Sequence, residues 1–169
     1  PALINLGNAL QAVGRPEDAV KKFERALELD PGAGIAASNL ASALNDLALH
    51  EESRRAGERA VQLSSELPDA YVNLGNALLG LGRSEAAEAK YTAALELDPH
   101  HPGAWFNLGN AHADADNFRA AVSSYTKAVQ FDPGNGDAHY NLANAYQQLD
   151  AYTDAIENFE RALAIEPGH

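Results

Sequence analysis

Apolar residues recur at helical spacing in short stretches along this chain, and small or polar residues separate the stretches. In residues 68–101 the first stretch places four apolar side chains on one helix face: Leu74, Ala77, Leu78 and Leu81. Gly82-Arg83-Ser84 then interrupts the pattern, and a second apolar stripe follows: Ala87, Tyr91, Ala94, Leu95 and Leu97. Pro99 marks its end, because proline cannot continue a helix interior. The pattern predicts a helix–turn–helix unit.

The same pattern recurs every 34 residues from one end of the chain to the other. Asparagine followed by leucine stands at five places: Asn5-Leu6, Asn39-Leu40, Asn73-Leu74, Asn107-Leu108 and Asn141-Leu142. Alanine recurs in the same frame at ten more: Ala9, Ala43, Ala77, Ala111, Ala145, Ala26, Ala60, Ala94, Ala128 and Ala162. Neither helix of a unit can bury its stripe alone, so a period of this size indicates stacked units.

We therefore expect an all-α fold and one continuous array over residues 1–169. Its five units are 1–33, 34–67, 68–101, 102–135 and 136–169. Gly75 and Gly109 cost helix propensity, roughly 1 kcal/mol each relative to alanine, which close contact with a second helix would offset. The recurring aromatic residues Phe23, Tyr91, Tyr125 and Phe159 are expected to pack opposite such small positions.

The second unit, residues 34–67, departs from this pattern. Ser53 replaces the recurring alanine, Gly57 replaces the aromatic residue, and Ser65 replaces the late proline. Loss of the aromatic side chain should leave a void or force a local collapse. Either neighbouring side chains move in, or the gap marks a hinge or admits a side chain from a partner.

Charge narrows the range of partners. The chain has 24 acidic and 12 basic residues, a formal net charge of −12, which argues against nucleic acid and anionic membrane surfaces. A neutral or basic polypeptide is electrostatically easier to bind. There is no apolar run long enough to span a bilayer and no signal peptide is visible. The compartment stays unassigned, with a soluble cytoplasmic protein as the default expectation.

Candidate chemistry is sparse. The chain has no cysteine, and the histidine pair His100-His101 has no third ligand at a convincing spacing, so no metal site and no cofactor are expected. Glycines from Gly75 to Gly80 have phosphate-loop spacing, but Leu81 follows where lysine is required. His112 and His139 stand at aromatic packing positions. The chain is not expected to be an enzyme.

These residues resemble the tetratricopeptide repeat (TPR) family along the whole chain. Residues 102–135 show the family pattern of aromatic, Leu-Gly, alanine, aromatic, alanine and late proline: Trp105, Leu108-Gly109, Ala121, Tyr125, Ala128 and Pro133. The resemblance implies a right-handed superhelical solenoid of five helix–turn–helix units. It also implies that the first helix of each unit lines a concave groove that carries the ligand contacts.

The groove implied by this resemblance would present a ladder of carboxamides. The expected peptide-binding residues are Asn5, Asn8, Asn39, Asn73, Asn76, Asn107, Asn110, Asn141 and Asn144, with Phe106 and Tyr140 as aromatic contacts. A carboxamide both donates and accepts hydrogen bonds, so it can bind the backbone of an extended peptide. TPR domains of O-GlcNAc-transferase-like proteins use a similar asparagine ladder. The alternative is that these asparagines serve helix packing or solubility.

The leading hypothesis is a protein–protein interaction scaffold that binds an extended peptide or partner segment. One alternative is a substrate-recruiting arm of a larger enzyme, such as a glycosyltransferase, since the chain reads as an excised piece of a longer protein. Another is a self-assembling structural scaffold. No polar capping element is visible at either end, so the stripe around Ile156, Phe159 and Leu163 should be uncovered, which would allow head-to-tail homo-oligomers.

Overall fold

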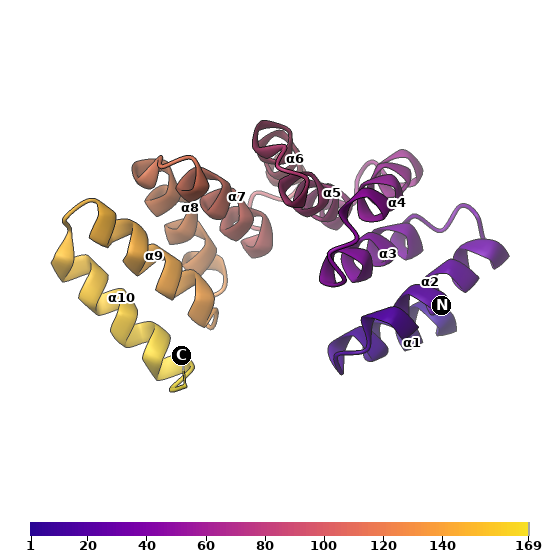
Figure 1. The fold of residues 1–169 in the computed structure, drawn as a ribbon, viewed down its shortest axis with the longest axis horizontal. Helices are drawn as coiled ribbons and strands as arrows, with labels where there is room; N and C mark the ends of the chain where they lie inside the picture. The colour runs from indigo at the N-terminus through magenta and orange to yellow at the C-terminus, as the bar shows by residue number, and fades with distance from the viewer. Residues whose placement is uncertain (169) are drawn as a thin grey trace. The chain divides into compact units, whose positions relative to one another are not determined.

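The computed structural model describes residues 1–168, and these residues form ten α-helices and no strand. The helices alternate along the chain as first and second members of five pairs (Figure 1). The first helices are α1 (Ala2–Ala12), α3 (Gly34–Asp46), α5 (Pro68–Gly80), α7 (Pro102–Asp114) and α9 (Gly136–Gln148). The second helices are α2 (Pro16–Leu29), α4 (His50–Leu63), α6 (Ser84–Leu97), α8 (Phe118–Phe131) and α10 (Tyr152–Ile165).

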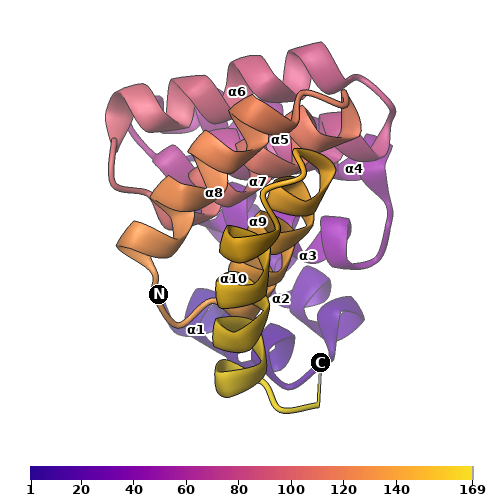
Figure 2. The ribbon, with the colours of Figure 1, turned by 90° about the vertical axis from the view of Figure 1, so that its left-hand side faces the viewer.

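The chain divides into two compact units, Pro1–Leu97 with α1 to α6 and Asp98–His169 with α7 to α10. In the first unit α1 packs on α2, α3 on α4 and α5 on α6, while α2 also contacts α3 and α4 contacts α5. In the second unit α7 packs on α8, α8 on α9, and α9 on α10, a pair that lies side by side in Figure 1 and with α10 in front of α9 in Figure 2. The predicted helix pairs are confirmed.

The helix ends follow from local sequence. Pro16, Pro68 and Pro102 each occupy the first turn of a helix, where a missing N–H costs nothing. The turn within each pair contains one residue of positive φ at the same place in the repeat: Gly14, Ala48, Gly82, Asp116 and Asp150. Glycine adopts this conformation freely, and alanine does not. Ala48, with φ of 56°, is therefore the strained member of the series.

Aromatic side chains of second helices pack directly on glycines of the first helices. A Cβ atom added at Gly109 would lie 2.5 Å from the ring of Tyr125, and one added at Gly75 would lie 2.5 Å from the ring of Tyr91. Tyr91 and Tyr125 are almost fully buried. The glycines therefore allow the close contact that the sequence predicts, and any larger residue would push the two helices of the pair apart.

In the second repeat, where Gly57 stands in place of the aromatic residue, helix α4 lies close against α5 of the next repeat. A Cβ atom added at Gly57 would lie 3.0 Å from Cβ of Leu74 and 3.1 Å from its Cα, so the backbones of α4 and α5 approach closely here. Ser53 donates to the carbonyl of Ala41 at 2.8 Å and satisfies its own buried hydroxyl. Leu74 is thus the side chain that lies opposite Gly57.

Candidate functional site

Within each compact unit, the first helices present a surface that we call the first-helix face. All 12 lysines and arginines of the chain lie outside the five first helices, in second helices and turns. The charged side chains of the first helices, with histidine neutral, are four aspartates: Asp46, Asp69, Asp114 and Asp137. The second helices, by contrast, carry internal ion pairs such as Arg54 with Glu51 and Glu58, and Arg161 with Glu157. The first-helix face is therefore neutral to acidic.

Pairs of asparagines connect successive first helices. Asn39 on α3 donates its Nδ2 to Oδ1 of Asn8 on α1 at 2.7 Å. Asn141 on α9 donates its Nδ2 to Oδ1 of Asn110 on α7 at 3.0 Å. The two pairs occupy the same positions in their repeats. The asparagines that the sequence predicts as peptide ligands thus also bind one another, which ties neighbouring repeats together.

Tyrosines from the second helices support this arrangement. The hydroxyl of Tyr125 donates to Oδ1 of Asn110 at 2.7 Å, and that of Tyr91 donates to Oδ1 of Asn76 at 2.9 Å. Burial raises the pKa of Tyr125, and the charge of Asp114 raises it further, while a hydrogen bond from Asn141 opposes the shift. The Tyr125 hydroxyl therefore stays neutral at physiological pH and can act as a donor to Asn110.

The ladder changes where Ser42 stands in place of asparagine. Gln11 donates to Oγ of Ser42 at 2.9 Å and to Oδ2 of Asp46 at 2.7 Å. Asn73 instead donates to the carbonyl and the hydroxyl of Ser38, both at 3.1 Å. Gln11 and Ser38 were not among the residues predicted for the site. An exchange at one repeat position redirects the hydrogen bonds of its neighbours, and the repeat register would have indicated that position.

The aromatic residues predicted for the groove lie against the second helices. The ring centroid of Phe106 is 6.0 Å from that of Tyr125, and that of Tyr140 is 5.6 Å from that of Phe159 in an edge-to-face arrangement. Tyr140 nevertheless remains 40% exposed. Of the remaining predicted residues, Asn5 is exposed, and three are half-buried: Asn76, Asn107 and Asn144.

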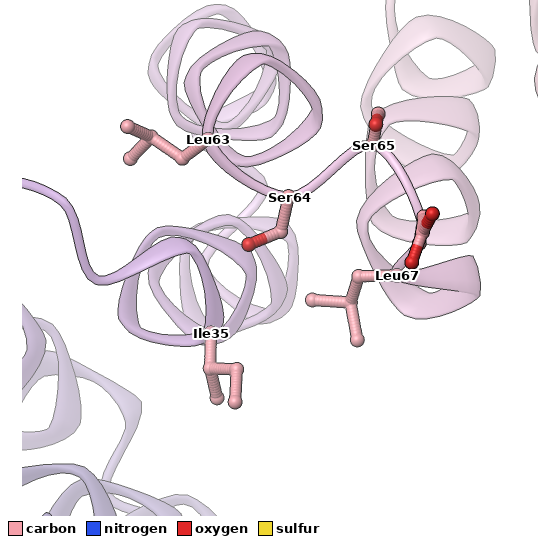
Figure 3. Close-up of a pocket in the computed structure, with 6 residues that line it drawn as sticks. Ile35, Leu63, Ser64, Ser65 and Leu67 are labelled. Atoms are coloured by element: carbon pink, nitrogen blue, oxygen red, sulfur yellow. The ribbon is translucent and has the colours of Figure 1, made fainter.

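Other chemistry is weakly represented. A shallow hollow of about 450 Å³ lies beside the second repeat and is lined by Ile35, Leu63, Ser64, Ser65, Glu66 and Leu67 (Figure 3). Its hydroxyls and single carboxylate form no arrangement for nucleophilic catalysis. In the part of the chain that the structure describes, no group of three or more potential ligands could hold a metal ion. None of the helices described is both long and apolar enough to cross a membrane.

Two of the histidines considered in the sequence analysis, His101 and His139, have structural partners. His101 accepts from the backbone N–H of Ala104 at 3.1 Å and so caps the N-terminus of α7. His139 is buried, and its Nδ1 lies 3.0 Å from Oδ1 of Asn158. His139 is thus a satisfied packing residue, as the sequence indicates.

Helix pairs of fixed period, stacked within each unit so that a second helix contacts the first helix of the next pair, define a helical repeat protein. Residues 4–68, 72–136 and 136–169 match the tetratricopeptide repeat family, and the chain belongs to that family. No curated protein matches the chain in sequence.

Solved structures resemble the chain over nearly its whole length. The TPR protein TTC0263 of Thermus thermophilus is 23% identical with a TM-score of 0.88, and the match covers 99% of this chain and 91% of that one. YrrB, described as a TPR protein with an unusual peptide-binding site, is 28% identical with a TM-score of 0.68, covering 99% and 86%. MamA is 22% identical with a TM-score of 0.76, covering 95% and 94%.

Proposed function

We propose that this protein is a non-catalytic interaction scaffold that binds an extended peptide or partner segment along its first-helix face. The residues that would contact the peptide are the asparagines of the ladder, together with Phe106 and Tyr140. The partner is a polypeptide of neutral or basic character, because the face carries aspartates and lacks lysine and arginine.

The asparagine pairs are the observation that carries the proposal. Within each pair, one Nδ2 and one Oδ1 are used, and the structure gives no partner within residues 1–168 to the other two groups. These are Nδ2 of Asn8 with Oδ1 of Asn39, and Nδ2 of Asn110 with Oδ1 of Asn141. A pair therefore offers one donor and one acceptor, the complement of a peptide unit. The peptide-binding site of YrrB, a relative in fold, supports this role.

Selection from a displayed library of linear peptides with random sequence tests the proposal. The intact chain should enrich binders, and the double variant Asn110→Ala with Asn141→Ala should lose most of their affinity. Gln62→Ala and Gln130→Ala remove carboxamides from the second helices α4 and α8 and should leave binding unchanged. Equal loss in these control variants, or failure to enrich any peptide, would contradict the proposal.

A second candidate function, self-assembly, is favoured by exposed apolar residues at the two end helices. Leu6 on α1 is 46% exposed, whereas Leu74 and Leu142, at the same repeat position, are 3% exposed. On α10, Leu163 is 50% exposed, whereas Leu27 at the same position is 6% exposed. Where these positions are buried, they face a neighbouring helix. The exposed face of α1 therefore suits the exposed face of α10 in a second copy.

A further inference from the structure

Two aspartates at the same repeat position differ in their hydrogen bonding. Asp46 ends α3 and Asp114 ends α7. The carboxylate of Asp46 accepts from Nε2 of Gln11 at 2.7 Å. Asp114 is exposed and has neither a hydrogen bond nor an ion pair with any described residue of its own unit, 98 to 168.

Negative charge at this position is electrostatically unfavourable for the helix. The last carbonyls of a helix carry partial negative charge, so a carboxylate at the C-terminus is repelled and a cation would be attracted. At Asp46 the amide of Gln11 offsets part of this repulsion. The charge of Asp114, by contrast, contributes to the raised pKa of the Tyr125 hydroxyl. The structure thus holds an uncompensated negative charge beside Tyr125.

The same charge lies beside the asparagine pair of the second unit. Asn110 and Asp114 are four residues apart on α7 and therefore share one helix face. The hydroxyl of Tyr125, whose pKa the charge of Asp114 raises, donates a hydrogen bond to Asn110. A peptide whose backbone meets the free Nδ2 of Asn110 would have a neighbouring side chain within reach of the carboxylate.

We propose that Asp114 selects a lysine or arginine in the bound segment, next to the peptide unit that Asn110 and Asn141 hold. This inference rests on the proposed function. The cationic head of the ligand would pair with the carboxylate of Asp114 and also be favoured by the C-terminal carbonyls of α7. At the corresponding place on α3, the carboxylate of Asp46 already accepts a hydrogen bond from Gln11, so selection for a cation is weaker there.

The test uses the displayed library of random linear peptides and the intact chain. Sequences bound by the wild-type protein should be enriched in lysine or arginine at one position. For a synthetic peptide made from the selected sequence, Asp114→Asn should raise Kd about fivefold, as expected for one exposed ion pair. The difference between the two proteins should shrink as salt is added. Asp154→Asn removes a matched charge from the second helix α10 and should leave Kd unchanged.

The outcomes separate this inference from the proposal beneath it. If peptides bind through Asn110 and Asn141 but show no basic preference, the role of Asp114 is wrong and the proposed function stands. Equal Kd values for the wild-type protein and Asp114→Asn would overturn the inference in the same way. If no peptide is enriched at all, both fail.

Discussion

The hydroxyl of Tyr125 and the side chain of Asn141 both donate to Oδ1 of Asn110, at 2.7 and 3.0 Å. A buried residue of α8 thereby fixes the orientation of a carboxamide on the first-helix face. Asn110 would otherwise be free to rotate, and its remaining Nδ2 would have no fixed direction. The packing of the repeat and the proposed peptide contact therefore depend on the same oxygen atom.

Tyr125→Phe should lower the free energy of unfolding by about 1 kcal/mol, the net contribution of a typical hydrogen bond. It should also weaken peptide binding, because Asn110 loses one of its two donors. Urea denaturation of the intact chain measures the first effect. Tyr152→Phe is the matched control, since Tyr152 is exposed and donates only to the exposed Asp150. A stability for Tyr125→Phe equal to that of the control would count against the hydrogen bond.

The stability of the protein at alkaline pH should also depend on the Tyr125 hydroxyl. Burial raises the pKa of Tyr125 above the ordinary value of 10.0, so the folded protein favours the neutral form. The contribution of this residue is complete below pH 10 and is lost as pH rises, because the unfolded chain releases the proton first. Urea denaturation at increasing pH should show a steeper loss of stability for wild type than for Tyr125→Phe. Parallel curves would show that Tyr125 titrates normally.

Ala48→Gly should stabilise the protein. Ala48 has a φ of 56°, which costs an L-residue about 1 kcal/mol, and glycine relieves most of this strain. Thermal and urea denaturation should both show the gain. Gly14→Ala places alanine at the equivalent turn, where φ is 73°, and should lower the stability of the protein. Destabilisation by Ala48→Gly would indicate that the gain in chain entropy of the unfolded state outweighs the strain.

Much of this architecture could be predicted from the sequence. The 34-residue period predicts the helix pairs, and Pro99 correctly marks the end of α6 at Leu97. The small residues Gly75 and Gly109 do lie under aromatic rings. These features depend on residue size and on backbone chemistry, which a repeat displays several times over.

The hydrogen bonds of the candidate site could not be predicted in the same way. Asparagine at a groove position is equally compatible with a free ligand contact and with a bond to a neighbouring repeat, since the choice depends on side-chain rotamers set by two helices. Asn141 binds Asn110, but Asn73 binds Ser38, although Asn73 and Asn141 share a repeat position. The exchange of asparagine for Ser42 is the visible cause, and its effect requires the coordinates.

Restoring the family's aromatic residue in the second repeat should destabilise the folded protein. Gly57→Phe would crowd the contact between α4 and α5, since even a Cβ atom would be 3.1 Å from Cα of Leu74. We expect a loss of about 1–3 kcal/mol of unfolding free energy, typical of an overpacked core. Gly103→Ala is a milder glycine control on α7, where a Cβ would meet only the ring of His101 at 3.4 Å. Stabilisation by Gly57→Phe would instead reveal unfilled space.

Association of the isolated chain should depend on concentration through its two end helices. The helix α1 carries no charged residue, so burying its exposed face against α10 of a second copy would desolvate no ionised group of α1.

Leu163→Glu, and separately Leu6→Glu, should shift sedimentation towards the monomer, because each places a charge in the apolar contact. Leu63→Glu makes the same exchange at an exposed site on α4 and should leave association unchanged. A mixture of the two end variants should form dimers but no oligomer larger than a dimer, because each variant retains one intact face. Monomers at every concentration, or equal dissociation by Leu63→Glu, would contradict head-to-tail contact.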